Sequence, residues 1–359
     1  MDSRERITRI LNLEEPDVIA VQDFPWGETI SRWRNEGFPL AGVEPGDYFG
    51  FEFYFISTDY SPRYEAFTLE ETDRWRISTN AWGAVNKGWK GRSGTPALIR
   101  PAVNNLEEFK ERIEAFLDID DPRRIISPKY PFRGALEQGI KNLQKKYFVV
   151  ASFLEPFEIG RALMGTERLC INFIRDPKFI FYMFDTYAKF LAECGKSLID
   201  AGVDGLWAWG DIAYRDGPFV GPHHYQKLLA PAHRKIFSAF RKRGLPVILH
   251  TDGDVRPLIP DFIKSGVTAL QPLEAKAGMD VRELKEKYGD QLALIGNMDV
   301  RALSGTLEDV KREVLSKIPI ACEGGGYILC SDHSVPPTVP LQNYEYMIKL
   351  AKKHGRYTP

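Results

Sequence analysis

The chain has 359 residues, of which 43% are hydrophobic and 27% are charged. Lys and Arg together number 48 and Asp and Glu together number 49, so the formal net charge is −1. Proteins that bind nucleic acids or anionic membrane surfaces usually carry a basic excess, so this balance argues against both kinds of partner.

The cysteine content and the first residues bear on the cellular setting. Four cysteines in 359 residues are too few for a disulfide framework, which favours a reducing compartment. The opening residues MDSRERITRILNLEEPD are charged and lack the apolar stretch of a signal peptide. No run of 18 apolar residues occurs, so the sequence predicts no membrane span. We therefore expect a cytoplasmic protein.

Short apolar runs alternate with amphipathic stretches, most regularly in the C-terminal half. Continuous apolar runs are typical of parallel strands that are buried on both faces. Alternation of such strands with helices predicts βα units. The predicted strands are Asp17–Val21, Phe51–Ile56, Phe148–Phe153, Gly205–Trp209, Pro246–His250, Thr268–Pro272, Leu292–Gly296 and Gly326–Cys330.

Helix signals lie between these strands. Asp176 followed by proline predicts a helix start, and Gly202 predicts its end. Thr306 with Asp309 has the spacing of a capping box.

The predicted fold is a single-domain (β/α)8 barrel over residues 1–359, with a doubly wound sheet as the alternative. One region interrupts the alternation. Residues Phe51–Arg100 are rich in Tyr, Phe, Trp and Thr and contain alternating stretches. We expect an antiparallel insertion after the second strand, at about residues 57–100.

In a (β/α)8 barrel, catalytic residues lie at the carboxyl ends of the strands. Polar or ionisable groups follow six of the eight predicted strands, so we expect them to gather at one mouth of the barrel. The residues singled out for chemistry are Asp211, His250, Asp252, Glu274, Asp299, Cys330 and His333.

His250, Asp252 and Cys330 have the composition of a metal site. An imidazole, a carboxylate and a thiolate suit tetrahedral Zn²⁺, and a catalytic zinc uses three protein ligands and one open position. The alternative is structural. Cys330 would then be a small buried hydrophobe, His250 a hydrogen-bonded residue at a strand end, and Asp252 a turn former before Gly253.

Four segments carry a resemblance to a known family. WAWGDIAYRDGPFVGPHHYQKLLAPAHRKI, VILHTDGD, ALIGNMD and GGGYILCSDHSVPPTVPLQNYEYM resemble the uroporphyrinogen decarboxylase superfamily, most clearly from Asp176 onward. The resemblance implies a (β/α)8 barrel with one of two activities. One is decarboxylation of the acetate arms of uroporphyrinogen without a cofactor. The other is corrinoid-linked methyl transfer with zinc.

The N-terminal region departs from the decarboxylase pattern. That branch has an arginine-rich segment resembling FMRQAGRYLPEY, which binds substrate carboxylates. This chain has DFPWGETISRWRNEGFP at Asp23–Pro39, with Arg32 and Arg34 but without that motif. A substrate rich in carboxylates needs converging arginines, so the methyltransferase branch is favoured. The family's C-terminal histidine does have a match, in His333.

The coenzyme M methyltransferases have a His-x-Cys pair and a distant cysteine. His250 and Cys330 match this pattern, whereas Asp252 replaces the first cysteine. The resemblance implies zinc at His250 and Cys330, with Asp252 or Glu274 as an oxygen ligand. A carboxylate in place of a thiolate leaves zinc more Lewis acidic, which suits activation of a methoxy leaving group.

We therefore expect a zinc-dependent methyltransferase that moves a methyl group between a small methoxylated or methylamine-type substrate and cobalamin. An internal Asp-x-His-x-x-Gly corrinoid motif is absent, so the cobalamin would come on a separate corrinoid protein. Asp211, Asp299 and His333 are the candidate proton donors. The resemblance is compatible with a homodimer. Aromatic residues would line the substrate pocket or, alternatively, pack in the core: Trp26, Trp33, Trp207, Trp209 and Tyr214.

Two other functions compete with this expectation. The first is cofactor-free decarboxylation of a tetrapyrrole or another polycarboxylate. The second is non-catalytic binding of a corrinoid or a tetrapyrrole.

Overall fold

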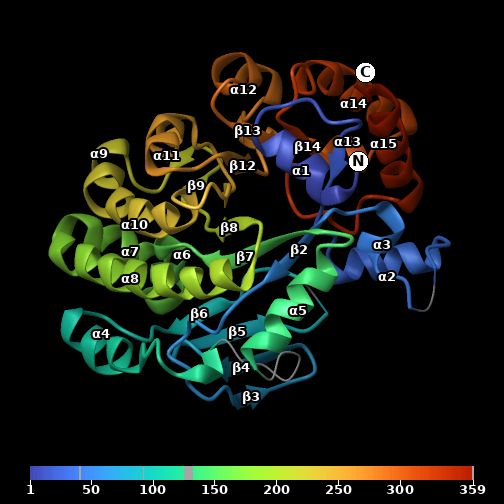
Figure 1. Ribbon diagram of the computed structural model, residues 1–359. Coiled ribbons are helices and arrows are strands. Elements are labelled where there is room, and N and C mark those ends of the chain that lie inside the picture. Colours follow the sequence, from blue (N-terminus) through green and yellow to red (C-terminus); the bar gives the residue numbers. More distant parts are fainter. Residues whose placement is uncertain (40–41, 92, 125–131, 358–359) are drawn as a thin grey trace.

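A computed structural model describes residues 1–39, 42–91, 93–124 and 132–357. Its central feature is a curved sheet of eight strands, with neighbouring strands parallel throughout (Figure 1). In order across the sheet they are β1 (Ala20–Val21), β14 (Tyr327–Leu329), β13 (Ala293–Ile295), β12 (Ala269–Gln271), β11 (Val247–His250), β8 (Gly205–Trp209), β7 (Phe148–Leu154) and β2 (Phe53–Ile56).

Hydrogen bonds join the first and last strands of this order. The backbone N–H of Glu52 donates to the carbonyl of Val21 at 3.1 Å. The backbone N–H of Phe53 donates to the side-chain oxygen of Gln22, also at 3.1 Å. The sheet therefore closes on itself, which confirms the predicted (β/α)8 barrel. Each of the eight predicted strands overlaps one observed strand.

Helices surround the barrel (Figure 1). The helix signals read from the sequence are present: the Asp176 side chain accepts from the backbone N–H of Phe179, Gly202 ends that helix, and Thr306 forms a capping box with Asp309. The helices are α1 (Ser3–Leu11), α2 (Gly27–Asn35), α3 (Pro45–Phe49), α4 (Leu106–Arg112), α5 (Arg133–Leu143), α6 (Pro156–Met164), α7 (Thr166–Arg175), α8 (Pro177–Ala201), α9 (Pro222–His224), α10 (Ala230–Arg241), α11 (Ile259–Ser265), α12 (Val281–Tyr288), α13 (Val300–Leu303), α14 (Leu307–Ala321) and α15 (Leu341–His354).

The predicted insertion is also present. After β2 the chain forms a four-stranded antiparallel sheet before it reaches α4, seen at the bottom of Figure 1. Its strands are β3 (Thr68–Glu71), β4 (Trp75–Thr79), β5 (Val85–Trp89) and β6 (Ala97–Arg100). A short hairpin of β9 (Ala213–Tyr214) and β10 (Gly217–Pro218) follows β8. Both additions follow carboxyl ends of barrel strands, where loops shape the functional face.

Side chains fill the inside of the barrel. Large rings come from β2, β7 and β8, whereas β1, β12 and β13 contribute alanines, so the interior is close-packed and is not a pore. Cys330, just beyond β14, belongs to this interior cluster and is 1% exposed. Among the described residues, no helix combines the length and apolar character needed to cross a membrane.

Candidate metal centre at the carboxyl end of the barrel

Three side chains converge where β8 and β11 end. Asp211 lies two residues after β8, His250 is the last residue of β11, and Asp252 follows two residues later. Because β8 and β11 are paired with His250 beside Trp209, the loops after them start side by side. One ligand atom from each of the three residues lies within 4.8 Å of the others.

The spacing of these atoms suits a shared metal ion. His250 Nε2 is 3.6 Å from Asp211 Oδ1, and the backbone N–H of Asp252 donates to the same oxygen at 3.4 Å. Ligand atoms about 2.0–2.2 Å from one tetrahedral zinc lie roughly 3–4 Å apart. Oδ1 of Asp252 is buried and has no hydrogen-bond partner among the described residues. A bound cation would satisfy that oxygen, so the residues present fit a metal.

Gln271 orients the imidazole of His250. The two residues are paired across β11 and β12, and Nδ1 of His250 is hydrogen-bonded to the side-chain oxygen of Gln271. An amide oxygen only accepts, so Nδ1 donates and Nε2 is the nitrogen that faces Asp211. Histidines that bind metals usually have their other ring N–H fixed in this way.

The charges of the cluster depend on one another. Burial lowers the pKa of His250, but the hydrogen bond to Asp211 and the charges of Asp252 and Asp211 outweigh burial and raise the pKa to about 9. Burial raises the pKa of Asp211, yet His250 holds that pKa well below its ordinary value. Burial raises the pKa of Asp252. A positive charge between the carboxylates of Asp211 and Asp252 would therefore stabilise them. Either a proton on His250 or a metal ion can supply that charge.

Cys330 and Glu274 adjoin this cluster but make other contacts. The Cys330 thiol accepts from Nε2 of Gln271 at 3.6 Å and donates to Oδ1 of Asp23 at 3.7 Å, and burial raises its pKa well above the ordinary value. Glu274 accepts from the backbone N–H of Gly253 at 2.7 Å and pairs with Lys276 at 2.7 Å. Glu274 therefore holds the loop that carries Asp252.

The two remaining proton-donor candidates are placed differently. His333 Nε2 lies 3.6 Å from Oδ2 of Asp252, so this imidazole borders the cluster. Asp299 accepts from the backbone N–H of Arg301 at 2.8 Å, caps α13 and forms an ion pair with the Arg301 guanidinium at 2.6 Å. Its carboxylate is thus engaged in local structure.

An ion pair on α6 also reaches the cluster, and neither of its residues is among the candidates from the sequence. Nη1 of Arg161 lies 2.7 Å from a carboxylate oxygen of Glu158 and 3.4 Å from Oδ2 of Asp211. Burial raises the pKa of Glu158 to about 7. Glu158 lies four residues after the end of β7, inside the helix that follows, so a search for polar residues directly at the strand ends did not reach it.

Aromatic rings form one wall beside His250. Trp209 lies 4.8 Å from the His250 ring, 5.3 Å from Phe24 and 5.8 Å from Phe55, measured between centroids. These three aromatic rings are partly buried above the barrel interior. Of the five aromatic residues expected to line a pocket, two do contact the cluster: Trp26 contacts His333 and Trp209 contacts His250. Trp33 and Trp207 are fully buried, and Tyr214 is exposed.

A known structure shares this fold. The chain is similar to a methyltransferase from Methanosarcina mazei, with a TM-score of 0.66, 15% identity, and 98% of this chain and 99% of the other covered. At this identity the similarity establishes the barrel fold.

Sequence comparison identifies the family. A curated uroporphyrinogen decarboxylase from Trichodesmium erythraeum is 24% identical over 255 residues, covering 67% of this chain and 68% of the relative. Another, from Chlorobium phaeovibrioides, is 22% identical over 189 residues, and the chain spans about half of its length (51%). The family profile described as Uroporphyrinogen decarboxylase (URO-D) matches residues 91–354, most of the chain, which therefore belongs to the URO-D family.

Proposed function

We propose that this protein is a zinc-dependent methyltransferase that moves a methyl group between a small methylated substrate and the cobalamin of a separate corrinoid protein. The substrate class is methoxylated or methylamine-type. The observation that carries the proposal is the cluster of Asp211, His250 and Asp252, whose spacing and unpaired carboxylate oxygen fit a metal ion.

The proposed ligands are His250, Asp252 and Asp211, with Cys330 and Glu274 as the other candidates near them. Asp211, expected from the sequence as a proton donor, is assigned here to the metal because of its 3.6 Å approach to His250 Nε2. When bound, zinc would supply a Lewis acid that improves the leaving group of the methyl donor.

His333 is the proposed proton carrier. Its Nε2 faces Asp252 at 3.6 Å, and its ring is held against Trp26 at 5.8 Å between centroids. A general acid must lie within hydrogen-bond reach of the departing atom. A methyl donor bound beside Asp252 would place its departing atom within reach of His333. Asp299 is less suited because its carboxylate is bound to Arg301.

The surroundings favour an apolar donor over a polycarboxylate. Phe24, Phe55 and Trp209 offer a flat wall beside His250, suited to the body of a small apolar or aromatic molecule. Two arginines on the helices that follow β1 and β7 are already paired. Arg32 binds Glu36 and the carbonyl of Pro337, and Arg161 binds Glu158 and Asp211.

The second candidate function is decarboxylation of a tetrapyrrole or another polycarboxylate without a cofactor. It is favoured by the match to the URO-D family and by the names of the curated relatives. Under this alternative, the acidic groups at the mouth would handle protons and no metal would be required.

Zinc content and methyl transfer test the proposal. Purified protein should hold about one zinc per chain, and His250→Ala and Asp252→Ala should lose it, whereas the control His223→Ala, at an exposed histidine, should keep it. Cob(I)alamin on a corrinoid protein should be methylated in the presence of a methoxylated or methylamine-type donor. Folded protein without metal would refute the proposal, and decarboxylation of uroporphyrinogen at a normal rate would establish the second candidate. Corrinoid binding without transfer from any donor would indicate a binding protein.

The setting and assembly of the enzyme are part of the proposal. All four cysteines are free, and a reducing cytoplasm is the proposed setting. The corrinoid protein would dock over the mouth formed by the strand ends, and a homodimer is the proposed assembly. Analytical ultracentrifugation, with and without the corrinoid protein, tests both associations.

A further inference from the structure

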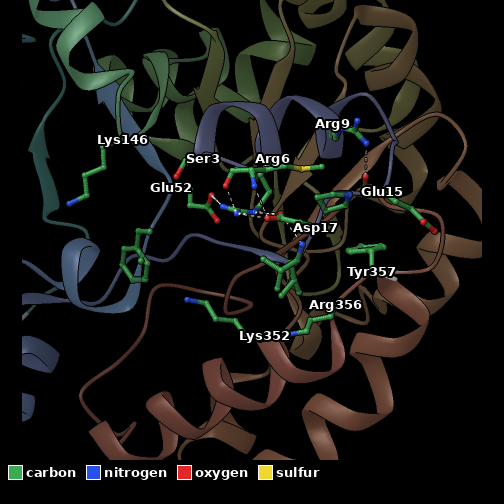
Figure 2. A pocket seen from close by; sticks show the side chains of 16 residues that line it. Ser3, Arg6, Arg9, Glu15, Asp17, Glu52, Lys146, Lys352, Arg356 and Tyr357 are labelled. Atoms are coloured by element: carbon green, nitrogen blue, oxygen red, sulfur yellow. Dashed lines mark hydrogen bonds and ion pairs between the residues drawn. The ribbon is translucent and has the colours of Figure 1, made fainter. Parts of the chain in front are cut away.

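A cavity lies at the end of the barrel opposite the candidate metal centre. It has a volume of about 930 Å³ and is bounded by residues that precede β1, β2 and β7, together with parts of α1 and the end of α15 (Figure 2). The amino-terminal end of a (β/α)8 barrel faces away from the loops that carry catalysis. The cavity is therefore separate from the candidate metal centre.

Cations dominate the lining of this cavity, although the whole chain is nearly neutral. Five Lys or Arg side chains line it against three carboxylates, whereas the chain carries a net charge of −1. The cations are Arg6, Arg9, Lys146, Lys352 and Arg356, and the carboxylates are Glu15, Asp17 and Glu52.

Two of the carboxylates are already neutralised within the floor of the cavity. Arg6 binds Asp17 at 2.7 Å and Glu52 at 2.6 Å, as the dashed lines in Figure 2 show, and the N-terminal ammonium of Met1 binds Asp17 at 3.0 Å. This guanidinium holds the pKa of Asp17 well below its ordinary value, so the Asp17 carboxylate remains charged and bonded to Arg6. These two carboxylates therefore offer little to the remaining cations.

The other cations surround the same opening (Figure 2). Lys352 and Arg356 have no side-chain hydrogen bond or carboxylate partner among the described residues. Within the part of the chain that the structure describes, the Arg9 guanidinium donates only to the backbone carbonyl of Glu15, at 3.3 Å. Lys146 binds Asp47, which does not line the cavity.

The basic end of α15 has an ordinary explanation, since cations stabilise the C-terminal end of a helix. That explanation suits Lys353 and His354, which are exposed. Lys352 differs because it is partly buried, and its ammonium lies 3.4 Å from the position that a Cβ on Gly50 would occupy. The left-handed Gly50, at φ +76°, leaves space beside this ammonium. Lys352 is thus held over the cavity.

We infer that this cavity binds an anion that carries phosphate or carboxylate groups, with Lys352 and Arg356 as its main contacts and Arg9 and Lys146 at its rim. A volume of 930 Å³ exceeds the need of a single oxyanion and lies in the range of small-molecule sites. The ligand class is accordingly a polyvalent organic phosphate or polycarboxylate. Its binding is independent of the zinc and the methyl donor proposed above.

Isothermal titration calorimetry of the full chain at constant ionic strength tests the inference, with pyrophosphate and citrate as the probes. Saturable binding of either probe is expected: a preference for pyrophosphate assigns a phosphate ligand, and a preference for citrate assigns a carboxylate ligand. Lys352→Gln and Arg356→Gln should each weaken binding by about tenfold or more, because each removes a charged contact. Lys353→Gln, the neighbouring exposed lysine, is the matched control and should bind like the unaltered protein.

Thermal unfolding supplies an independent readout. Unpartnered cations repel one another, so Lys352→Gln should unfold at a higher temperature than the unaltered protein when no anion is added. With pyrophosphate or citrate added, the unaltered protein should unfold at a higher temperature than Lys352→Gln, because it binds the anion more tightly. Absence of saturable binding with both probes, or equal weakening by Lys353→Gln, would overturn the inference. Zinc content should be unchanged in every variant, which separates this result from the proposed function.

Discussion

Gln271 accepts a hydrogen bond from Nδ1 of His250 and thereby turns Nε2 toward Asp211. The same amide donates to the Cys330 sulfur at 3.6 Å, so one buried side chain connects the histidine with the cysteine. Gln271 is 2% exposed and cannot exchange these contacts freely for water. Through the pairing of β11 with β12, Gln271 therefore sets which nitrogen of His250 faces Asp211.

Gln271→Leu should weaken zinc binding by about 10–100-fold, because the imidazole loses the partner that fixes its orientation. Gln271→Glu should retain more of the affinity, since a carboxylate still accepts from Nδ1. Competition with a chromogenic chelator measures both affinities. Equal zinc affinity in Gln271→Leu and the unaltered protein would contradict this role, provided that circular dichroism shows both folded.

The barrel itself was predictable because its strands are buried on both faces. Runs such as residues 247–249 and residues 148–151 are continuously apolar, and that pattern needs no knowledge of long-range contacts. The end of the predicted strand Pro246–His250 then placed His250 and Asp252 at the mouth of the barrel. Barrel topology alone brings them to the same rim as Asp211.

The contacts between side chains in the candidate site could not be predicted from the sequence. Whether Asp211 or Cys330 approaches His250 depends on the loop after β8, which Arg161 contacts from α6. The bridge through Gln271 depends on pairing between two strands that are distant from Cys330 in sequence. Such contacts follow from side-chain packing and strand register, and neither leaves a periodic pattern in one sequence.

Gly210, directly before Asp211, should not tolerate a side chain. A Cβ there would lie 2.2 Å from a carboxylate oxygen of Glu155, which is 1% exposed. Glu155 cannot easily yield, because it caps α6 and binds His233 at 2.9 Å. Gly210→Ala should therefore cost about 1–3 kcal/mol in the free energy of unfolding and should weaken zinc binding by moving Asp211.

Urea denaturation measures the stability change, and chelator competition measures the zinc affinity. Gly88→Ala is the matched control, since no atom lies within 4 Å of its added Cβ. A fully stable Gly210→Ala protein with normal zinc affinity would show that the loop after β8 is not held as the structure indicates.

His233 should be among the residues that most affect stability. It is 0% exposed and lies between Glu155, 2.9 Å from Nε2, and the Tyr225 hydroxyl, 2.9 Å from Nδ1. His233→Ala would leave the buried Glu155 carboxylate without this partner, at a cost of about 3–5 kcal/mol. Urea unfolding tests the value. The exposed His223→Ala should change stability by less than about 0.5 kcal/mol, and a similar effect of both substitutions would refute the prediction.

The four cysteines should react with iodoacetamide in an order set by burial. The thiolate is the reactive form, and burial raises the pKa of Cys194 and of Cys322 to about 11. Burial also raises the pKa of Cys170, but this side chain is only partly buried and remains open to reagent. At pH 8 the folded protein should therefore be alkylated first at Cys170. Because the thiolate fraction grows as pH rises toward the pKa, labelling of Cys194 and Cys322 should increase steeply only toward pH 11.

The labelling of Cys330 in the same experiment tests whether this thiol belongs to the candidate metal centre. Its thiol is 1% exposed, and its pKa is raised well above the ordinary value, so metal-free protein should protect it as strongly as Cys194. Peptide mass spectrometry after timed alkylation measures each site separately. Rapid labelling of Cys330 in metal-free protein that zinc suppresses would indicate a thiolate ligand. Slow labelling with and without zinc is the expected result if Asp211, His250 and Asp252 hold the metal and Cys330 remains a thiol between Gln271 and Asp23.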